Sequence, residues 1–268
     1  MPLISLHYTD LAVAALLLLV NGGLSMVLAL GLARPLAVAS LRMVVQLSLV
    51  GLVLTRLFAL ETPWLTLGAA LVMLLFAGQE TMARQERRLA GWWAYGIGTG
   101  AMGTAAGIVL LLGLSTAVRP DPWWDARYAI PMLGMVLGNA MSGVGLALHT
   151  LTAAAARERP AIEAQLALGS TRWVALRPVL RHALRTALMP TINSMAAMGV
   201  VALPGMMTGQ ILSGVDPGEA VKYQILIMFL ISGATGLGVL MAALATVRRL
   251  SDRRHRLRLD RLVRRDSA

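Results

Sequence analysis

The chain has 268 residues, of which 57% are hydrophobic and only 14% are charged. Soluble domains carry roughly a quarter charged residues, so this composition excludes an ordinary soluble protein and indicates a polytopic membrane protein. Cysteine is absent, which excludes a disulfide framework, a thiolate metal site and a cysteine nucleophile.

Seven apolar runs approach the roughly 20 residues that a helix needs to cross a bilayer. No basic cluster precedes the first run and no clear small-residue cleavage site follows it, so we expect it to be retained. The third run is short, and the sixth contains Pro190 and Pro204. The predicted spans are 11–32, 37–58, 63–78, 92–114, 129–148, 188–212 and 224–247.

The positive charge is distributed unevenly between the loops. The net charge of +11 rests on arginine, with Lys222 as the one lysine. If the loops alternate sides across seven spans, one side carries 20 arginines and the other carries four basic residues. Because cytoplasmic loops are enriched in lysine and arginine, we predict an all-α protein with about seven transmembrane helices, its N-terminus outside and its C-terminus in the cytoplasm.

The distribution of apolar spans and basic loops also predicts the domain organisation. We expect a single transmembrane domain over residues 1–250 and a basic cytoplasmic tail over residues 251–268. Such a tail is suited to the anionic headgroups of membrane lipid. No aromatic or glycine motif of a nucleic-acid binder accompanies it, so we expect no nucleic-acid partner.

Glycines spaced by four recur in the fourth and fifth spans, as Gly96 with Gly100, Gly103 with Gly107, and Gly134 with Gly138 in the fifth. Small residues at this interval allow helix backbones to approach closely in lipid. The spacing fits packing within one chain, and it also fits a homodimer face.

The sixth span is the candidate pore-lining helix. Pro204 removes a backbone donor deep in the span, and non-helical backbone at such depth is tolerated only inside protein or beside a wet cavity. Polar side chains within spans also suggest function, because they are costly in lipid. The predicted translocation residues are Gln46, Asn139, Asn193, Pro204, Gly205, Met206, Met207, Thr208 and Gln210.

Methionines are frequent in the same segment. Thioethers are soft ligands that suit Cu(I), and Met206 and Met207 are the candidate metal ligands. The alternative is that methionine fills irregular gaps in the core. No histidine lies within a predicted span, so the sequence does not specify a tight transition-metal cage.

A polar stretch, IEAQLALGSTRW, interrupts the oily chain within residues 157–187, which the predicted topology places in the cytoplasm. Pro160 suits a first helical turn, residues 161–168 are mostly good helix formers, and Gly169 suits the position after a helix end. A short capped helix, longer than a bare connection needs, indicates docking to another protein.

This stretch resembles the coupling helix of ABC-transporter permeases, which reads E-A-A, three residues, then glycine. Gln165 stands here in place of the second alanine. Together with IPMLGMVLGNAMSGVGLAL (130–148) and VALPGMMTGQILSGVDPGEAVKYQI (201–225), the chain resembles the bacterial iron-export ABC permease family, which includes plant permeases linked to aluminium tolerance. The resemblance spans roughly residues 35–250.

The resemblance implies the multi-pass permease subunit of an exporter of iron or another metal ion in the bacterial inner membrane. A separate ATP-binding subunit would drive it, and the permease would form a homodimer. ATP and Mg²⁺ would bind that partner, and no cofactor is expected on this chain. The sequence agrees on one point, because it contains no G-x-x-x-x-G-K-[ST] phosphate loop. The residues expected to couple to the ATPase are Ile162, Glu163, Ala164, Leu166 and Gly169.

Two other classes of function remain open on the sequence. An ion-driven carrier or channel would need no ATPase, but it predicts charged relays within the membrane, and the spans are nearly free of them. A membrane enzyme would need a clustered acid, base or nucleophile within the bilayer, which the sequence does not show.

Overall fold

A computed structural model of the chain describes residues 7–60, 62–252 and 254–264. These residues are predominantly helical, which confirms the predicted all-α class of membrane fold. The chain divides into two compact units. The first holds the first two helices with residues 212–214, and the second holds residues 63–211 together with the chain from residue 215 onward.

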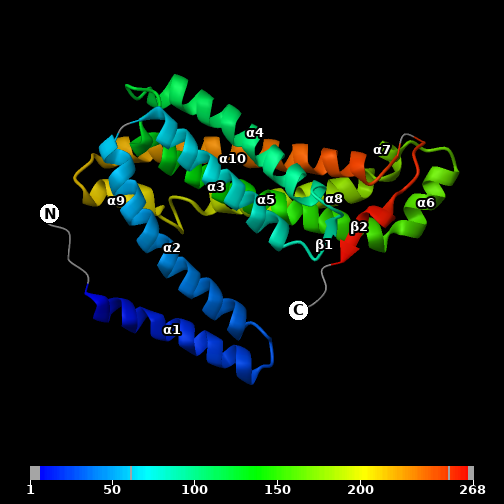
Figure 1. Ribbon diagram of the computed structural model, residues 1–268, viewed down its shortest axis with the longest axis horizontal. Helices are drawn as coiled ribbons and strands as arrows, with labels where there is room; N and C mark the ends of the chain where they lie inside the picture. Colours follow the sequence, from blue (N-terminus) through cyan, green and yellow to red (C-terminus); the bar gives the residue numbers. More distant parts are fainter. Residues whose placement is uncertain (1–6, 61, 253, 265–268) are drawn as a thin grey trace. The chain divides into compact units, whose positions relative to one another are not determined.

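The first unit is a helical hairpin of α1 (Tyr8–Val27) and α2 (Ala33–Leu60), drawn in blue in Figure 1. In the turn between the helices, Leu32 donates its backbone N–H to Ser25 Oγ over 2.9 Å. Most of the large apolar side chains on both helices are exposed. A continuous apolar surface of this extent is suited to contact with lipid rather than water.

Five long helices build the second unit. α3 contacts α4 and α5, and α10 contacts α4, α5 and α8. These helices are α3 (Pro63–Ala83), α4 (Trp93–Leu112), α5 (Ala126–Arg157), α8 (Arg177–Ala197) and α10 (Pro217–Arg249). The shorter elements are β1 (Arg87–Leu89), the π-helical turn η1 (Gly113–Val118), α6 (Arg159–Ala167), α7 (Arg172–Ala175), α9 (Gly205–Leu212), the 3-10 turn η2 (Leu259–Arg261) and β2 (Leu262–Arg264).

The contact of α5 with α10 lies at the centre of this unit. Small residues on both helices are fully buried there, with Ala140 and Ala147 on α5 and Ala234 and Ala242 on α10 all at 0% exposure. In lipid the hydrophobic effect gives helix pairs little attraction, so small residues that permit close backbone approach hold them together. The centre of the unit therefore depends on close packing rather than on large side chains.

Six helical segments of the described chain are long and apolar enough to cross a membrane: α1, α2, α3, α4 with η1, α5 and α10. The predicted sixth span over 188–212, in which irregular backbone was expected at Pro204, consists of parts of two helices with a break between them. α8 begins earlier, at Arg177, and ends at Ala197, and α9 begins only at Gly205. Left-handed backbone at Gly199 (φ 85°) separates the two helices.

Together, α8, the loop over 198–204 and α9 still run from one end of the second unit to the other. In Figure 1, α8 runs beside α5, starting from the end where α7 lies, and α9 lies at the opposite end. Three arginines make the first half of α8 too polar to qualify as a membrane span by composition. The count of seven crossings and the predicted orientation of the termini stay predictions.

One end of the second unit gathers β1, α6, α7 and residues 250–264, and we call it the basic end (Figure 1). The predicted basic cytoplasmic tail, residues 251–268, stays a prediction, but the structure shows that its described residues up to 264 fold back onto the unit. β2 pairs antiparallel with β1, and Leu257, Leu259 and Leu262 pack against the cluster around the buried Leu89. Residues 253 and 265–268 of the expected tail lie outside the described residues.

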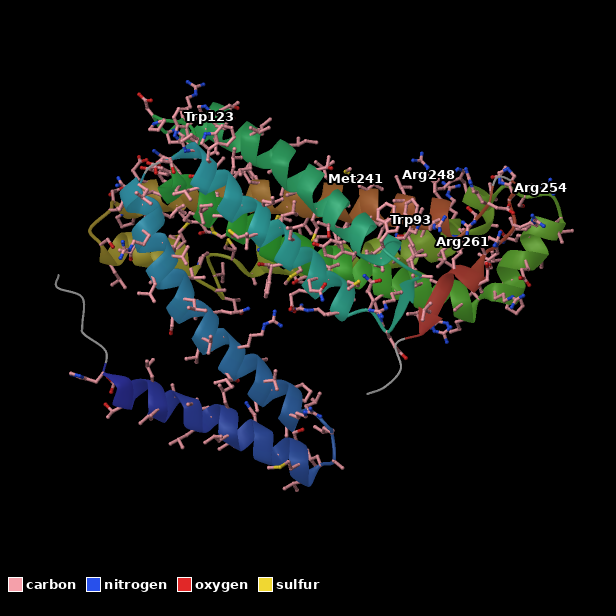
Figure 2. The ribbon with its side chains drawn as sticks, viewed as in Figure 1. Trp93, Trp123, Met241, Arg248, Arg254 and Arg261 are labelled. Atoms are coloured by element: carbon pink, nitrogen blue, oxygen red, sulfur yellow. The ribbon has the colours of Figure 1, made fainter. Side chains whose placement is uncertain are left out.

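Tryptophans mark both ends of the second unit. Trp93 lies at the start of α4 near the basic end, and Trp123 lies in the loop after η1 at the opposite end (Figure 2). The guanidinium carbon of Arg249 lies 4.4 Å from the Trp93 ring centroid. Tryptophan is enriched at both membrane–water interfaces, so these rings are suited to the two faces of the bilayer.

The α5–α10 contact gives a direct test of close packing. A Cβ on Gly143 would lie 2.7 Å from Thr235 Cγ2 and 3.1 Å from Val239 Cγ2, whereas a Cβ on Gly138 of the same helix would meet nothing within 4 Å. Gly143→Ala should therefore destabilise the protein by about 1–3 kcal/mol. Gly138→Ala should be neutral or stabilise it by up to about 1 kcal/mol. Thermal unfolding in detergent measures both, and equal behaviour would contradict the packing argument.

Candidate functional site

A cavity of about 550 Å³ lies where α8 ends, beside residues 198–204 and the N-terminal half of α10. Its lining is mainly apolar, and four thioether side chains from three segments meet there. These are Met195, Met198, Met207 and Met228. We call this cavity the methionine pocket.

The backbone beside the pocket makes several hydrogen bonds of its own although it is not helical. Val201 and Ala202 donate their N–H groups to the carbonyl of Ala197 over 3.0 and 3.1 Å, and Gly199 donates to the carbonyl of Ala202 over 3.0 Å. Irregular backbone at membrane depth is tolerated only where protein or a water-filled cavity adjoins it. The break is therefore a hydrogen-bonded loop that forms one wall of the methionine pocket.

Polar side chains lie in and around this region. Gln224 on α10 lines the pocket, is 8% exposed, and donates from Nε2 to Met198 Sδ over 3.7 Å. On α9, Thr208 donates from Oγ1 to the carbonyl of Pro204 over 3.1 Å. The Oε1 of Gln210 is buried and has no hydrogen-bond partner among the described residues. A buried acceptor without a partner is costly, so Gln210 is available to a polar ligand or to water.

The structure separates the two predicted metal ligands. Met207 lines the methionine pocket, but Met206 does not, and it is 36% exposed. Met228 was missed by the sequence reasoning because it belongs to the next helix, and no local pattern ties it to this segment. In the described residues no three His, Cys, Asp or Glu side chains gather where they could hold a metal ion. Any ion in the pocket would therefore meet mainly thioethers, the amide of Gln224 and backbone carbonyls.

The other predicted translocation residues are dispersed. Asn139 on α5 is exposed and donates from Nδ2 to the carbonyl of Met135 in its own helix over 2.9 Å. Asn193 on α8 is also exposed, and Gly205 forms the first turn of α9. None of these residues lines the methionine pocket. Gln46 belongs to the first unit, where it is half-buried.

A second hollow, of about 870 Å³, follows the outer face of α8. Arg177, Arg181 and Arg185 line its first half at intervals of four, and Leu188 and Ile192 continue it toward the methionine pocket. Residues four apart share a helix face, so this spacing was visible in the sequence. The sequence analysis nevertheless missed the arginine row, because the predicted span began at residue 188 and left these three residues outside it. The groove is basic at one end and apolar at the other.

The predicted helix in the polar stretch is present as α6, at the basic end. Pro160 lies in its first turn, and Arg159 pairs with Glu163 across 2.8 Å on its outer side. Ile162 is only 3% exposed and packs with the core cluster at the basic end, with Leu166 packed against the same cluster. Ile162, which we expected to contact a partner, therefore faces inward and anchors the helix.

The exposed side of α6 presents Glu163, Ala164 and Leu168, and Leu168 is 87% exposed. The helix ends as the sequence predicted. Gly169 has φ 90° and donates to Leu166 O over 3.0 Å, while Ser170 donates to Gln165 O over 3.1 Å. These two bonds form a Schellman motif, in which glycine takes the left-handed position without steric cost.

The C-terminal segment holds α7 directly after this helix. Arg172 donates its backbone N–H to His255 Nδ1 over 3.2 Å and its Nη1 to the carbonyl of Asp252 over 3.3 Å. Asp252 accepts hydrogen bonds of 2.9 Å from the backbone N–H groups of Arg254 and Arg256 and from Arg256 Nε. These bonds, led by the backbone N–H of Arg256, hold the pKa of Asp252 below its ordinary value because they favour the charged carboxylate.

An apolar helical bundle with a broken helix beside a cavity, and with a short exposed helix at one end, defines a multi-pass membrane protein. Comparison with known sequences gives the family. The chain belongs to the uncharacterised protein family UPF0014, whose sequence profile matches residues 8–251. No solved structure matches the chain.

Three relatives illustrate the family. The chain is 39% identical to the UPF0014 membrane protein slr1647 of Synechocystis, over 71% of this chain and 73% of that protein. It is 35% identical to the "Probable iron export permease protein FetB" of Escherichia coli, over 81% of each. It is 34% identical to the protein ALUMINUM SENSITIVE 3 of Arabidopsis thaliana, over 72% of this chain and 68% of that protein. The resemblance noted in the sequence is thereby confirmed.

Acid should loosen the C-terminal turn. Because the folded-state pKa of Asp252 is lowered, its contribution to stability is present above the ordinary carboxyl pKa of about 4 and is lost as the pH falls through the lowered value. Amide hydrogen exchange in residues 250–258, corrected for the intrinsic rate, should therefore rise below about pH 4. Asp252→Asn should raise it already at neutral pH, whereas Asp125→Asn, in the α5 cap, should not. Unchanged exchange in Asp252→Asn would contradict this role.

Proposed function

We propose that this protein is the membrane subunit of an ATP-driven exporter of a metal ion, with iron as the first cargo to test. It works in the inner membrane as a homodimer with two copies of a separate ATP-binding subunit, which carries ATP and Mg²⁺. The permease-type family membership supports a transport role. The observation that carries the ATP coupling is α6.

α6 has the construction that a coupling element needs. Its inner face is fixed, because Ile162 is buried in the core cluster at the basic end, and its outer face offers Ala164 and Leu168 to a partner. A movement of the ATP-binding partner against α6 is transmitted to the long helices only if α6 is packed firmly against them. α6 follows α5 with Glu158 between them and leads through α7 to α8, so its movement is passed to both helices.

The methionine pocket is the proposed cargo site. It lies where α8 gives way to the loop before α9, so a change in that loop would open or close it. Four thioethers and one amide give weak binding to a hard ion and tighter binding to a soft one. Weak binding suits transport, because a cargo must leave as readily as it enters.

The first experiment measures ATP hydrolysis by the purified permease with its candidate ATP-binding partner in liposomes, with and without ferrous iron. Stimulation by iron supports both the ATP coupling and the cargo. A stable complex without a response to iron keeps the ABC assignment and rejects iron. Failure to form a complex with any ATP-binding subunit rejects the ATP coupling and leaves an ion-driven carrier or channel.

Gly169→Val should uncouple ATP hydrolysis from transport. Valine is disfavoured at φ 90°, so the substitution should disrupt the end of α6 while leaving membrane insertion intact. Gly91→Val is the matched control, since Gly91 also has a left-handed φ of 69° with free space around it but lies between β1 and α4. Transport should fall by about tenfold or more only in the Gly169 variant, a change of about 1.4 kcal/mol in coupling. Retained transport in that variant would refute the coupling role.

Replacing two pocket methionines should weaken the cargo site. Met198→Leu with Met207→Leu keeps the apolar volume but removes two thioethers, so binding of ferrous iron should fall by at least about tenfold, as metal affinity does when even an outer partner is lost. Met206→Leu is the control, because Met206 is adjacent in sequence but outside the pocket. Calorimetric titration measures all three proteins. An equal effect of Met206→Leu would reject the methionine pocket as the cargo site.

A further inference from the structure

A third cavity, of about 410 Å³, lies at the basic end between α7, the end of α10 and the C-terminal segment. Its walls carry five arginines, Arg172, Arg248, Arg254, Arg256 and Arg261, and one carboxylate, Asp252. Figure 2 shows Arg248, Arg254 and Arg261 gathered at the basic end of the unit. This concentration of positive charge has no role in the proposed transport mechanism.

The single carboxylate of the cavity is already engaged. Asp252 forms an ion pair with Arg256 at 2.9 Å, and its oxygens also accept two backbone N–H groups. The nearby Asp260 pairs with Arg258 instead, through two hydrogen bonds of 2.8 and 2.9 Å. In the described part of the chain no carboxylate forms an ion pair with the remaining four guanidinium groups of the cavity.

Contacts other than ion pairs position three of the four groups, Arg172, Arg248 and Arg261. Arg172 and Arg248 lie on the Trp173 ring, with guanidinium carbons 5.6 and 5.9 Å from its centroid. Arg261 donates from Nη1 to the carbonyl of Arg249 over 2.8 Å. The Nε of Arg172 is buried, with no hydrogen-bond partner among the described residues. A buried N–H donor without a partner and four guanidinium groups without an ion pair in one cavity both favour binding of an anion.

The chemistry of the donors selects the class of anion. Guanidinium groups are planar forks that bind phosphate and carboxylate oxygens through paired hydrogen bonds. Here the forks come from three segments of the chain and line one cavity. A tetrahedral phosphate offers acceptor oxygens in several directions, whereas a planar carboxylate offers two in one plane. The cavity also exceeds the size of a single phosphate, so it accommodates part of a larger group.

We propose that this cavity is a binding site for a phosphate group, held by Arg172, Arg248, Arg254 and Arg261. The group belongs either to an anionic phospholipid headgroup or to a soluble phosphate compound. Both can reach the site, because it lies just beyond the last residue of α10, a helix of membrane-spanning length. An occupant would tie α7 to the C-terminal segment and so stabilise the corner that follows α6.

The test uses the full chain in nanodiscs and two matched double variants. Arg248→Gln with Arg254→Gln removes two of the four donors, while Arg84→Gln with Arg157→Gln removes the same charge from exposed positions outside the cavity. In phosphatidylcholine nanodiscs, pyrophosphate is titrated by calorimetry at constant ionic strength. In a second arm, native mass spectrometry measures retention of phosphatidylglycerol against phosphatidylcholine.

The first double variant should weaken binding by roughly tenfold or more in one of the two arms, and the second should not. A loss of pyrophosphate binding identifies a soluble phosphate, and a loss of phosphatidylglycerol retention alone identifies a headgroup. Equal weakening by both double variants, or no specific binding in either arm, would overturn the proposal. Arg254→Gln alone guards against misfolding, because the Arg254 side chain is exposed and makes no hydrogen bond within the described residues.

Discussion

The second unit depends on the close approach of α5 and α10. Both helices carry fully buried alanines, and at Gly143 of α5 even an added Cβ would lie only 2.7 Å from Thr235 Cγ2 of α10. This kind of contact is what lipid permits, because an apolar side chain gains little by leaving lipid for protein, and packing must supply the attraction. α4 and α8 pack against the same pair, so the positions of the methionine pocket and of α7 follow from it.

That constraint explains where the chain is irregular. Backbone in lipid must find its hydrogen-bond partners within the protein, and the loop between α8 and α9 finds several of them in the carbonyls of Ala197 and Ala202. The loop lies against α10, which contributes Gln224 and Met228 to the cavity beside it. The break is thus stable enough to persist and open enough to leave a cavity. A site of this construction can change shape by rearranging a few residues while the long helices keep their packing.

The basic end is stabilised differently from the long apolar helices, because it is rich in charged and polar groups. In water such charges are screened, and their hydrogen bonds compete with solvent. Here the chain uses tighter local motifs: the Schellman cap at Gly169, the carboxylate of Asp252 with three donors, and the pairing of β1 with β2. They surround α6 and α7 and fix the inner face of α6 through Ile162. In this arrangement a short exposed helix is joined rigidly to the bundle, and a cavity lined by arginines lies beside it.

The sequence by itself determined the membrane class, most of the spans, the helix at 159–167 and its glycine cap, because each depends on local composition or on residues a few positions apart. It also located the segment around Pro204 as irregular. It did not determine that α8 begins at Arg177 and already ends at Ala197, since apolar content alone does not show where a helix starts or stops.

Only the tertiary structure decided which methionines share a cavity, which face of α6 is buried and that the basic C-terminal segment folds back. Met228 on α10 lines the same cavity as Met198 after the end of α8, and β2 pairs with β1 across more than half of the chain. Such contacts join residues far apart in the chain. They form only once the close packing of the long helices has fixed where each segment lies. That packing depends on how whole helix faces fit together, which a local sequence pattern does not specify.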